Sequence, residues 1–135
     1  MKGIPQKSTV IPTCTNLDMF QPEDVPSEGF TLGYVGSVGS WYLFYEVAKA
    51  VARAFVMRPD ARFLVITKGN HHLVRNALNS AGADLDRVEV RGADFYEVSQ
   101  QIARMDAGIF FIRPSWSKRA SCPTRMGEFL ACGKP

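Results

Sequence analysis

The sequence predicts an α/β fold, a Rossmann-like, doubly wound parallel sheet with strand order 3-2-1-4. Short, nearly all-apolar runs alternate strictly with segments whose apolar residues recur at helical spacing. Strands that are apolar on both faces need helices on both sides, which is typical of parallel sheets. Because crossovers between parallel strands are right-handed, few topologies remain, and the doubly wound one is the commonest.

The first half of the pattern begins with a short apolar run, Thr31–Val35, which Gly36 closes. Such a run predicts a buried strand. Trp41–Met57 repeats apolar residues every three or four positions, which predicts a helix packed on the sheet. Arg62–Thr67 is again a continuous apolar run and predicts the second strand, and His71–Ala81 predicts the second helix, with a glycine directly after it.

The second half repeats the alternation with shorter elements. Arg87–Arg91 predicts the third strand and Phe95–Met105 the third helix. Ala107–Ile112 predicts a fourth strand because it is apolar throughout. Met126–Cys132 predicts the fourth helix, which ends at Gly133.

The chain divides into two parts of different character. Residues 1–29 are rich in proline, threonine and acids and show no sustained period, so we expect a linker there and a packed domain over residues 30–135. A helix that ends at Gly133 should lead into another strand. We therefore expect the domain to be incomplete at its C-terminal end.

Composition limits the class of protein. With 135 residues, 46% of them hydrophobic, the chain is large enough to bury a core as one domain. It has no apolar run near the ~18 residues of a membrane span and no secretory leader, so we expect a cytoplasmic protein with no membrane segment. Its net charge of +3 is too small and too localised for a nucleic-acid partner.

The cysteines predict neither a metal site nor a disulfide framework. There are three, and they form no C-x-x-C pair and no cluster with histidine. We interpret them as small residues of a reducing compartment.

The C-terminal segment has the features of an anion site. Residues 113–135 carry five cations against one acid, Glu128, and account for all of the net positive charge. Ser121, Pro123, Thr124 and Arg125 stand at the start of the predicted last helix, where free backbone N–H groups and the helix dipole attract phosphate. Charge alone leaves open a merely solvated helix.

A glycine loop lies beside this segment in the predicted topology. With order 3-2-1-4, strands one and four are neighbours, so the loops at residues 36–40 and 113–124 meet beyond the carboxyl ends of the strands. Gly33, Gly36 and Gly39 do not have the dinucleotide spacing, and a Walker lysine is absent, so NAD binding and P-loop hydrolysis are not favoured. What remains is a turn that a ligand can approach closely, or one that only needs glycine for its conformation.

Three segments carry a resemblance to a known family. Residues 10–20 are similar to an interdomain linker, residues 33–42 to a first strand with its glycine loop, and residues 120–135 to a donor-binding signature. In these segments the chain resembles the C-terminal, nucleotide-sugar-binding domain of retaining glycosyltransferases of the two-domain GT-B architecture, group 1 or GT4-like. The third match is specific, and the other two support it.

The resemblance implies a function in carbohydrate biosynthesis and a set of contacts. The domain would bind a nucleotide-diphosphate sugar, whose sugar is transferred with retention to an unknown acceptor. Glu128 would accept hydrogen bonds from the ribose hydroxyls, and the nucleobase would lie near Lys68 and Gly92. The diphosphate would face Gly36, Ser37, Gly39, Arg113, Ser121, Pro123, Thr124 and Arg125.

The resemblance also implies what this chain lacks. Neither a metal nor another cofactor is required. The acceptor contacts and the catalytic residues, unknown here, would belong to a missing N-terminal domain, so we expect these 135 residues to be inactive alone. That domain could also hold the protein at a membrane surface.

Two departures from the family pattern keep alternatives open. Many members have a second glutamate where this chain has Ala120, and an arginine and a lysine where it has Trp41 and Tyr42. Arg113, Lys118 or Arg125 could supply the missing charge. A non-catalytic module for a nucleotide sugar or phosphate ligand, or a nucleotide-sugar 2-epimerase of the same architecture, are the alternatives.

Overall fold

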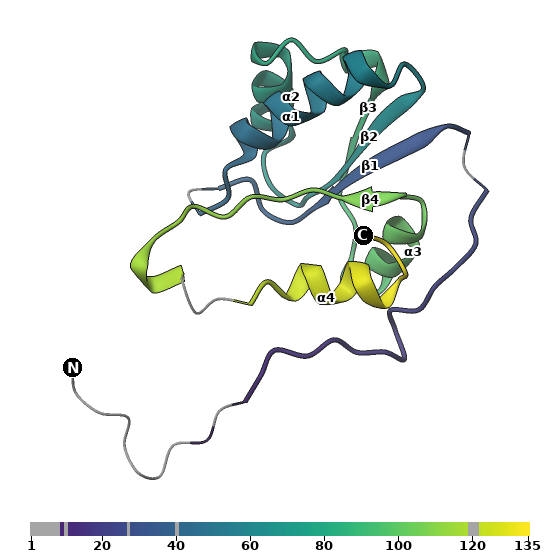
Figure 1. Ribbon diagram of the computed structural model, residues 1–135, viewed down its shortest axis with the longest axis vertical. Coiled ribbons are helices and arrows are strands. Elements are labelled where there is room, and N and C mark those ends of the chain that lie inside the picture. Colours follow the sequence, from purple (N-terminus) through teal and green to yellow (C-terminus); the bar gives the residue numbers. More distant parts are fainter. Residues whose placement is uncertain (1–8, 10, 27, 40, 119–121) are drawn as a thin grey trace.

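A computed structural model describes residues 9, 11–26, 28–39, 41–118 and 122–135 of the chain. Strands and helices alternate along it, as the sequence predicts (Figure 1). The elements are β1 Phe30–Val35, α1 Phe44–Met57, β2 Ala61–Ile66, α2 His71–Ser80, β3 Val88–Arg91, α3 Val98–Ala103, β4 Ala107–Gly108 and α4 Thr124–Ala131.

The four strands form one parallel sheet of order β3-β2-β1-β4, so the predicted class and strand order are confirmed. β1 and β2 pair along their full length, from Phe30 opposite Ala61 to Val35 opposite Ile66. The glycine that follows β1 therefore lies next to the end of β2, where ligands of such sheets bind.

The fourth strand is shorter than predicted. Only Ala107 and Gly108 pair with β1, whereas the apolar run extends to Ile112. Ile109 N–H still donates to Gly33 O of β1, at 2.8 Å. Beyond Ile109 the chain pairs with a different segment: Leu43 N–H donates to Phe111 O at 3.0 Å, and Tyr42 forms an antiparallel bridge with Ile112. The outer edge of Gly108 is occupied too, because its N–H donates to Pro135 O at 2.7 Å.

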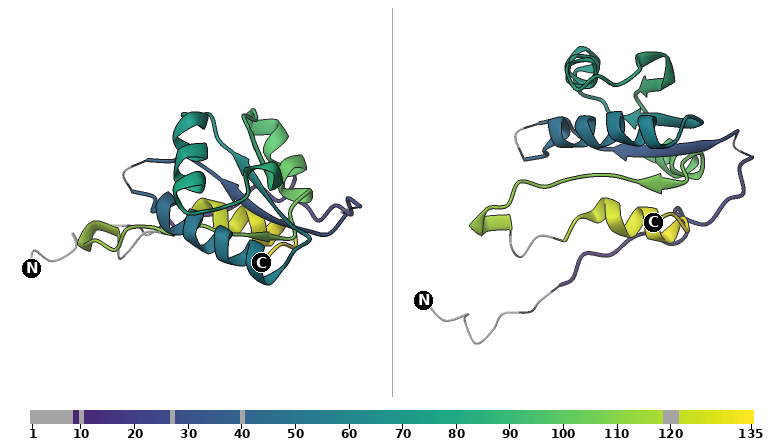
Figure 2. Two further views of the ribbon diagram at one scale, coloured as in Figure 1. Left: turned by 90° about the horizontal axis from the view of Figure 1, so that it is seen from above. Right: turned by 45° about the horizontal axis from the view of Figure 1, so that its top comes forward.

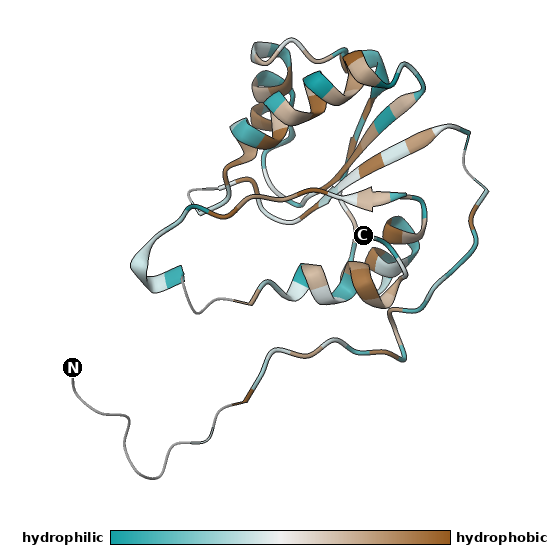
Figure 3. Cartoon of the chain, viewed as in Figure 1, coloured by the Kyte–Doolittle hydropathy of each residue, from teal (hydrophilic) through white to brown (hydrophobic). Residues whose placement is uncertain are grey.

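Helices cover both faces of the sheet. α1 and α2 lie on one face and α3 and α4 on the other (Figures 1 and 2). Two apolar clusters follow from this arrangement, one around Val47, Val51 and Phe63, the other around Ile102 and Phe129. Apolar residues dominate β2 and alternate with polar ones along α1, which exposes one side to water (Figure 3).

Local chemistry decides where the helices begin. Asn70 caps α2, because its side-chain oxygen accepts from His72 N–H at 2.9 Å. α4 begins at Thr124, two residues before the predicted start, and Pro123 occupies its N-cap, where the N–H that proline lacks would have no partner within the helix. The third helix divides into a 3-10 turn, Phe95–Glu97, and α3.

The segment before β1 contributes to the core. Phe20 is buried among the residues of the cluster around Ile102 and Phe129. A side chain at Gly127 would collide with Thr15, so this segment passes close to α4. Residues 15–20 therefore pack against the same helix that carries the predicted ligand groups.

Candidate functional site

A pocket of about 290 Å³ lies at the carboxyl ends of β1, β2 and β3, on the sheet face that α3 and α4 cover. Four residues that the sequence analysis assigned to ligand binding line it: Gly36, Ser37, Lys68 and Arg125. The remaining lining residues are Val35, Ile66, Thr67, Gly69, Ala93, Phe95 and Val98.

Hydrogen bonds to residues of β1 and β2 hold the glycine loop in place. Gly36 has φ +148°, a conformation that favours glycine, and its N–H donates to Ile66 O at 3.0 Å. Nothing stands within 4 Å of where a Cβ on Gly36 would lie, so its outer side is open to a ligand. The buried Tyr34 hydroxyl donates to Ser37 O at 2.7 Å, and burial raises the pKa of Tyr34 well above its usual value. The phenol therefore stays a donor and fixes the loop.

The two loops predicted to meet do meet. Arg113 N–H donates to Trp41 O at 2.9 Å, so the chain after β4 runs beside the chain after the glycine loop. The Lys118 ammonium lies 5.0 Å from the centre of the Trp41 ring, within the range of a cation–π contact. Trp41 therefore holds a cation close to the glycine loop.

The start of α4 presents a guanidinium to the pocket. Arg125 lines the pocket and pairs through Nη1 with Oε2 of Glu128, one turn further along. The Glu128 side chain is only 11% exposed and that of Arg125 31%. The carboxylate is thus more deeply buried than the guanidinium that pairs with it. Of this ion pair, only Arg125 lines the pocket, so the pair presents its positive charge to the pocket.

A hydrogen bond between side chains joins the loops that follow β2 and β3. Lys68 Nζ donates to Asp94 Oδ1 at 2.7 Å, and this hydrogen bond holds the pKa of Asp94 below its usual value. Thr67, whose side chain receives the Gly69 N–H at 3.0 Å, shapes the turn after β2. The Lys68 ammonium thus lies at the pocket where β2 ends, and the Asp94 carboxylate that pairs with it follows β3.

Not every predicted residue lines this pocket. Gly39, Gly92, Arg113, Pro123 and Thr124 are not among its lining residues. Ser121 and Ala120 lie outside the described residues.

Sequence reasoning missed Phe95, which lines the pocket and is 55% exposed. The prediction began the third helix at Phe95 and gave this side chain no role in binding. The available signal was the pair Asp94 and Glu97, three residues apart, which marks a helix start.

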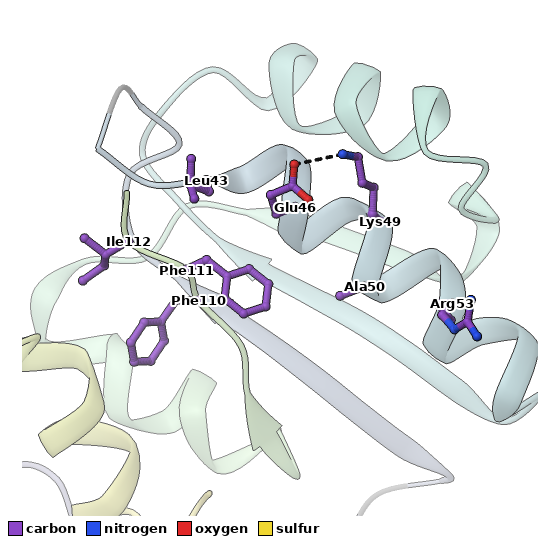
Figure 4. A pocket seen from close by; sticks show the side chains of 8 residues that line it. All are labelled: Leu43, Glu46, Lys49, Ala50, Arg53, Phe110, Phe111 and Ile112. Atoms are coloured by element: carbon purple, nitrogen blue, oxygen red, sulfur yellow. Dashed lines mark hydrogen bonds and ion pairs between the residues drawn. The ribbon is translucent and has the colours of Figure 1, made fainter. Parts of the chain in front are cut away.

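A larger hollow, of about 740 Å³, lies between α1 and the chain that follows β4 (Figure 4). Phe110, Phe111 and Ile112 form one wall, and the Glu46–Lys49 ion pair, at 2.9 Å, stands on the other. It contains neither the glycine loop nor the start of α4. Lys49 and Arg53 bring cations to this hollow, but the glycine loop and the N-terminal turn of α4 are both at the smaller pocket.

Metal and membrane features are absent from the described part of the chain. No three His, Cys, Asp or Glu side chains there are grouped so that they could hold a metal ion. Cys14 and Cys122 are exposed and Cys132 is buried, and all three are free thiols. None of the helices in this part has the length and apolar character needed to cross a bilayer.

Comparisons with known proteins place the fold. No protein-family model and no curated protein matches the sequence. Among solved structures, the pneumococcal O-GlcNAc transferase GtfA, in complex with UDP and GlcNAc, is similar over 86% of this chain with TM-score 0.68 and 17% identity. The C-terminal domain of the glycosyl transferase group 1 family protein LpcC from Francisella tularensis is similar over 70%, with TM-score 0.57 and 17% identity. An O-GlcNAc transferase from Thermobaculum terrenum is similar over 92%, with TM-score 0.60 and 19% identity.

The shared region is a part of each of those proteins. This chain covers 22% of the GtfA chain, 56% of the LpcC domain and 23% of the Thermobaculum terrenum enzyme. At these identities the likeness concerns the fold, a Rossmann-like domain that all three glycosyltransferases contain.

Proposed function

We propose that this chain is the donor-binding domain of a retaining glycosyltransferase of the group 1, GT4-like kind, which transfers a sugar from a nucleotide-diphosphate sugar. One observation carries the proposal: the glycine loop after β1 and Arg125 at the start of α4 line one pocket at the carboxyl ends of the parallel strands. This is where open α/β sheets bind nucleotides. The similarity in fold to GtfA, whose structure contains UDP and GlcNAc, supports it.

The phosphate-binding part of the pocket works through position and charge. Gly36 has no side chain, so a diphosphate can approach the backbone closely. The N-terminus of α4 carries about half a positive charge, and Arg125 adds a full one with the planar geometry that suits phosphate oxygens. These groups would stabilise the negative charge that develops on the departing diphosphate, with no metal required.

Ribose binding requires a rearrangement of the ion pair. In the structure Arg125 forms an ion pair with the carboxylate of Glu128. A bound diphosphate would attract the Arg125 guanidinium away from Glu128. The Glu128 carboxylate would then accept hydrogen bonds from the two ribose hydroxyls. Binding of the diphosphate and of the ribose would then support each other. The acceptor contacts and catalytic groups belong to the partner domain of such an enzyme.

Calorimetric titration with UDP, GDP, ADP and CMP tests the proposal. At least one nucleotide should bind, and Glu128→Ala should weaken it by about 1–3 kcal/mol, the usual loss when the charged partner of a buried hydroxyl is removed. Glu46→Ala, which removes an exposed glutamate of α1, is the matched control and should leave affinity unchanged. Binding of none of the four nucleotides would contradict the proposal.

A second function, a non-catalytic module for the same ligand class, is favoured by one feature of the sequence. Ala120 stands where the resemblance implies a sugar-contacting glutamate. Assays of the natural protein for donor hydrolysis and for sugar transfer separate the two functions. Nucleotide binding with no turnover of any donor would favour the module.

A further inference from the structure

The pocket has two chemically different ends. Gly36 and Ser37 follow β1, whereas Ala93 and Phe95 follow β3. β2 lies between these strands, and neighbouring strands are about 4.8 Å apart, so the two ends are separated by roughly 10 Å. A nucleoside diphosphate has this extent, with phosphates at one end and a planar base at the other. Gly36, Ser37 and Arg125 suit the phosphates, which leaves the β3 end for the base.

Phe95 provides an aromatic face at that end. It is 55% exposed, although it is one of the large apolar side chains, and it lines the pocket. Its ring packs edge-on against Tyr96, with centroids 5.6 Å apart. The backbone before it is fixed by the reciprocal hydrogen bonds of Asp94 and Glu97. A positioned, half-exposed aromatic ring on a pocket wall is a surface on which a base stacks.

The Lys68–Asp94 pair stands beside this ring. It connects the loop after β2 with the loop after β3, and its side chains are 69% and 79% exposed. A pair as exposed as this contributes little to folding stability. It does, however, present ammonium donors next to carboxylate acceptors, and each group retains capacity for further hydrogen bonds.

We propose that Phe95 stacks on the nucleobase of the bound ligand and that the Lys68–Asp94 pair selects the base by its hydrogen-bonding edge. The inference rests on the proposed function and specifies it. Guanine and uracil present a carbonyl oxygen beside a ring N–H, whereas adenine and cytosine present an amino group beside a bare ring nitrogen. A fixed donor beside a fixed acceptor therefore distinguishes the two classes once the ribose sets the orientation of the base.

Titration with four nucleoside diphosphates (GDP, UDP, ADP, CDP) and with inorganic pyrophosphate tests the stacking. Phe95→Leu should weaken the tightest nucleoside diphosphate by about 5- to 150-fold, corresponding to 1–3 kcal/mol per stacked base, and leave pyrophosphate unchanged. Phe95→Trp should retain affinity. Phe111→Leu, the same change in the larger hollow, is the control and should have no effect.

The outcomes separate the two proposals. If Phe95→Leu binds nucleoside diphosphates as the wild type does, the stacking inference is overturned and the proposed function stands. If pyrophosphate binds the wild type as tightly as they do, neither base nor ribose contributes, and both the stacking inference and the ribose contact of the proposed function are overturned. If neither nucleoside diphosphates nor pyrophosphate bind, both fail.

Base selection has its own test in the same assay. The wild type should discriminate between the oxo bases and the amino bases by about 10-fold or more, the value of one good bidentate edge contact. Lys68→Met and Asp94→Asn should each reduce that ratio without changing the affinity for pyrophosphate. An unchanged ratio in both variants would overturn this part of the inference.

Discussion

At the residue scale, the chemistry of the pocket depends on how side chains shield or expose one another. The ribose contact of Glu128 is implied by the resemblance alone and stays a prediction, whereas its ion pair with Arg125 agrees with their spacing of three residues on a helix. The burial of Glu128 could not be predicted, because that depends on α4 packing against the sheet and on residues 15–20 lying alongside. Phe95 was missed because an apolar residue at the start of a helical pattern gives no sign of its exposure, which the structure shows in the 3-10 turn Phe95–Glu97.

Tyr34 gives a prediction at this scale. Tyr34→Phe removes the hydroxyl that donates to Ser37 O, and one buried hydrogen bond contributes about 1 kcal/mol. The melting temperature should fall by about 3–5 °C for a domain of this size. Tyr45→Phe, at an exposed position of α1, should leave it unchanged. A melting temperature equal to that of the wild type for both variants would show that the Tyr34 hydroxyl does not hold the loop.

At the element scale, the sequence predicted the number, type and order of strands and helices but not all their limits. The apolar run 107–112 predicts one continuous strand. A local pattern does not show which segment each backbone group hydrogen-bonds with, so the early end of β4 at Gly108 could not be predicted. The partner of Ile112 is Tyr42, from the chain that follows the glycine loop, and this pairing ends the parallel strand. The same antiparallel pairing brings the chain after β4 beside the chain that follows the glycine loop.

Close packing between β4 and α4 can be tested with a single methyl group. A Cβ on Gly108 would stand 2.7 Å from Cε1 of Phe129, closer than atoms approach in proteins. Gly108→Ala should therefore lower the free energy of unfolding by about 1–3 kcal/mol, the usual cost of overpacking. Gly39→Ala, where nothing stands within 4 Å, is the control for urea denaturation. Equal stability of the two variants would contradict the packing of α4 on β4.

The ion pair between β3 and the end of α3 predicts a pH dependence. A hydrogen bond from Arg104, at 2.7 Å, holds the pKa of Glu89 below its ordinary value of 4.5, against the opposing effect of partial burial. A lowered folded-state pKa adds stability above the unfolded pKa, which is lost as the pH falls through the folded value. Both side chains are more than a third exposed, so the contribution is at most about 1 kcal/mol.

Glu89→Gln should accordingly be less stable than the wild type at neutral pH by a few tenths of a kcal/mol, in line with other exposed pairs. The gap should close as the pH falls below 4.5. Thermal unfolding of both proteins across this range measures it. A gap that stays constant down to the lowest pH would exclude the ion pair as its source.

At the scale of the whole molecule, topology determines where the ligand groups meet. The order β3-β2-β1-β4 follows from strict alternation and right-handed crossovers, and both can be inferred from sequence. From that order the meeting of the glycine loop with the chain after β4 could be predicted. What could not be predicted is the presence of two hollows, one with phosphate-binding features and one largely apolar beside α1.

Mapping backbone amide shifts by nuclear magnetic resonance during titration with a nucleoside diphosphate tests the central claim most directly. The account predicts that the largest changes occur in the smaller pocket, at Gly36, Ser37, Gly69, Phe95 and Arg125. Changes confined to Phe110, Phe111 and Ile112 in the larger hollow, or no changes at all, would contradict it.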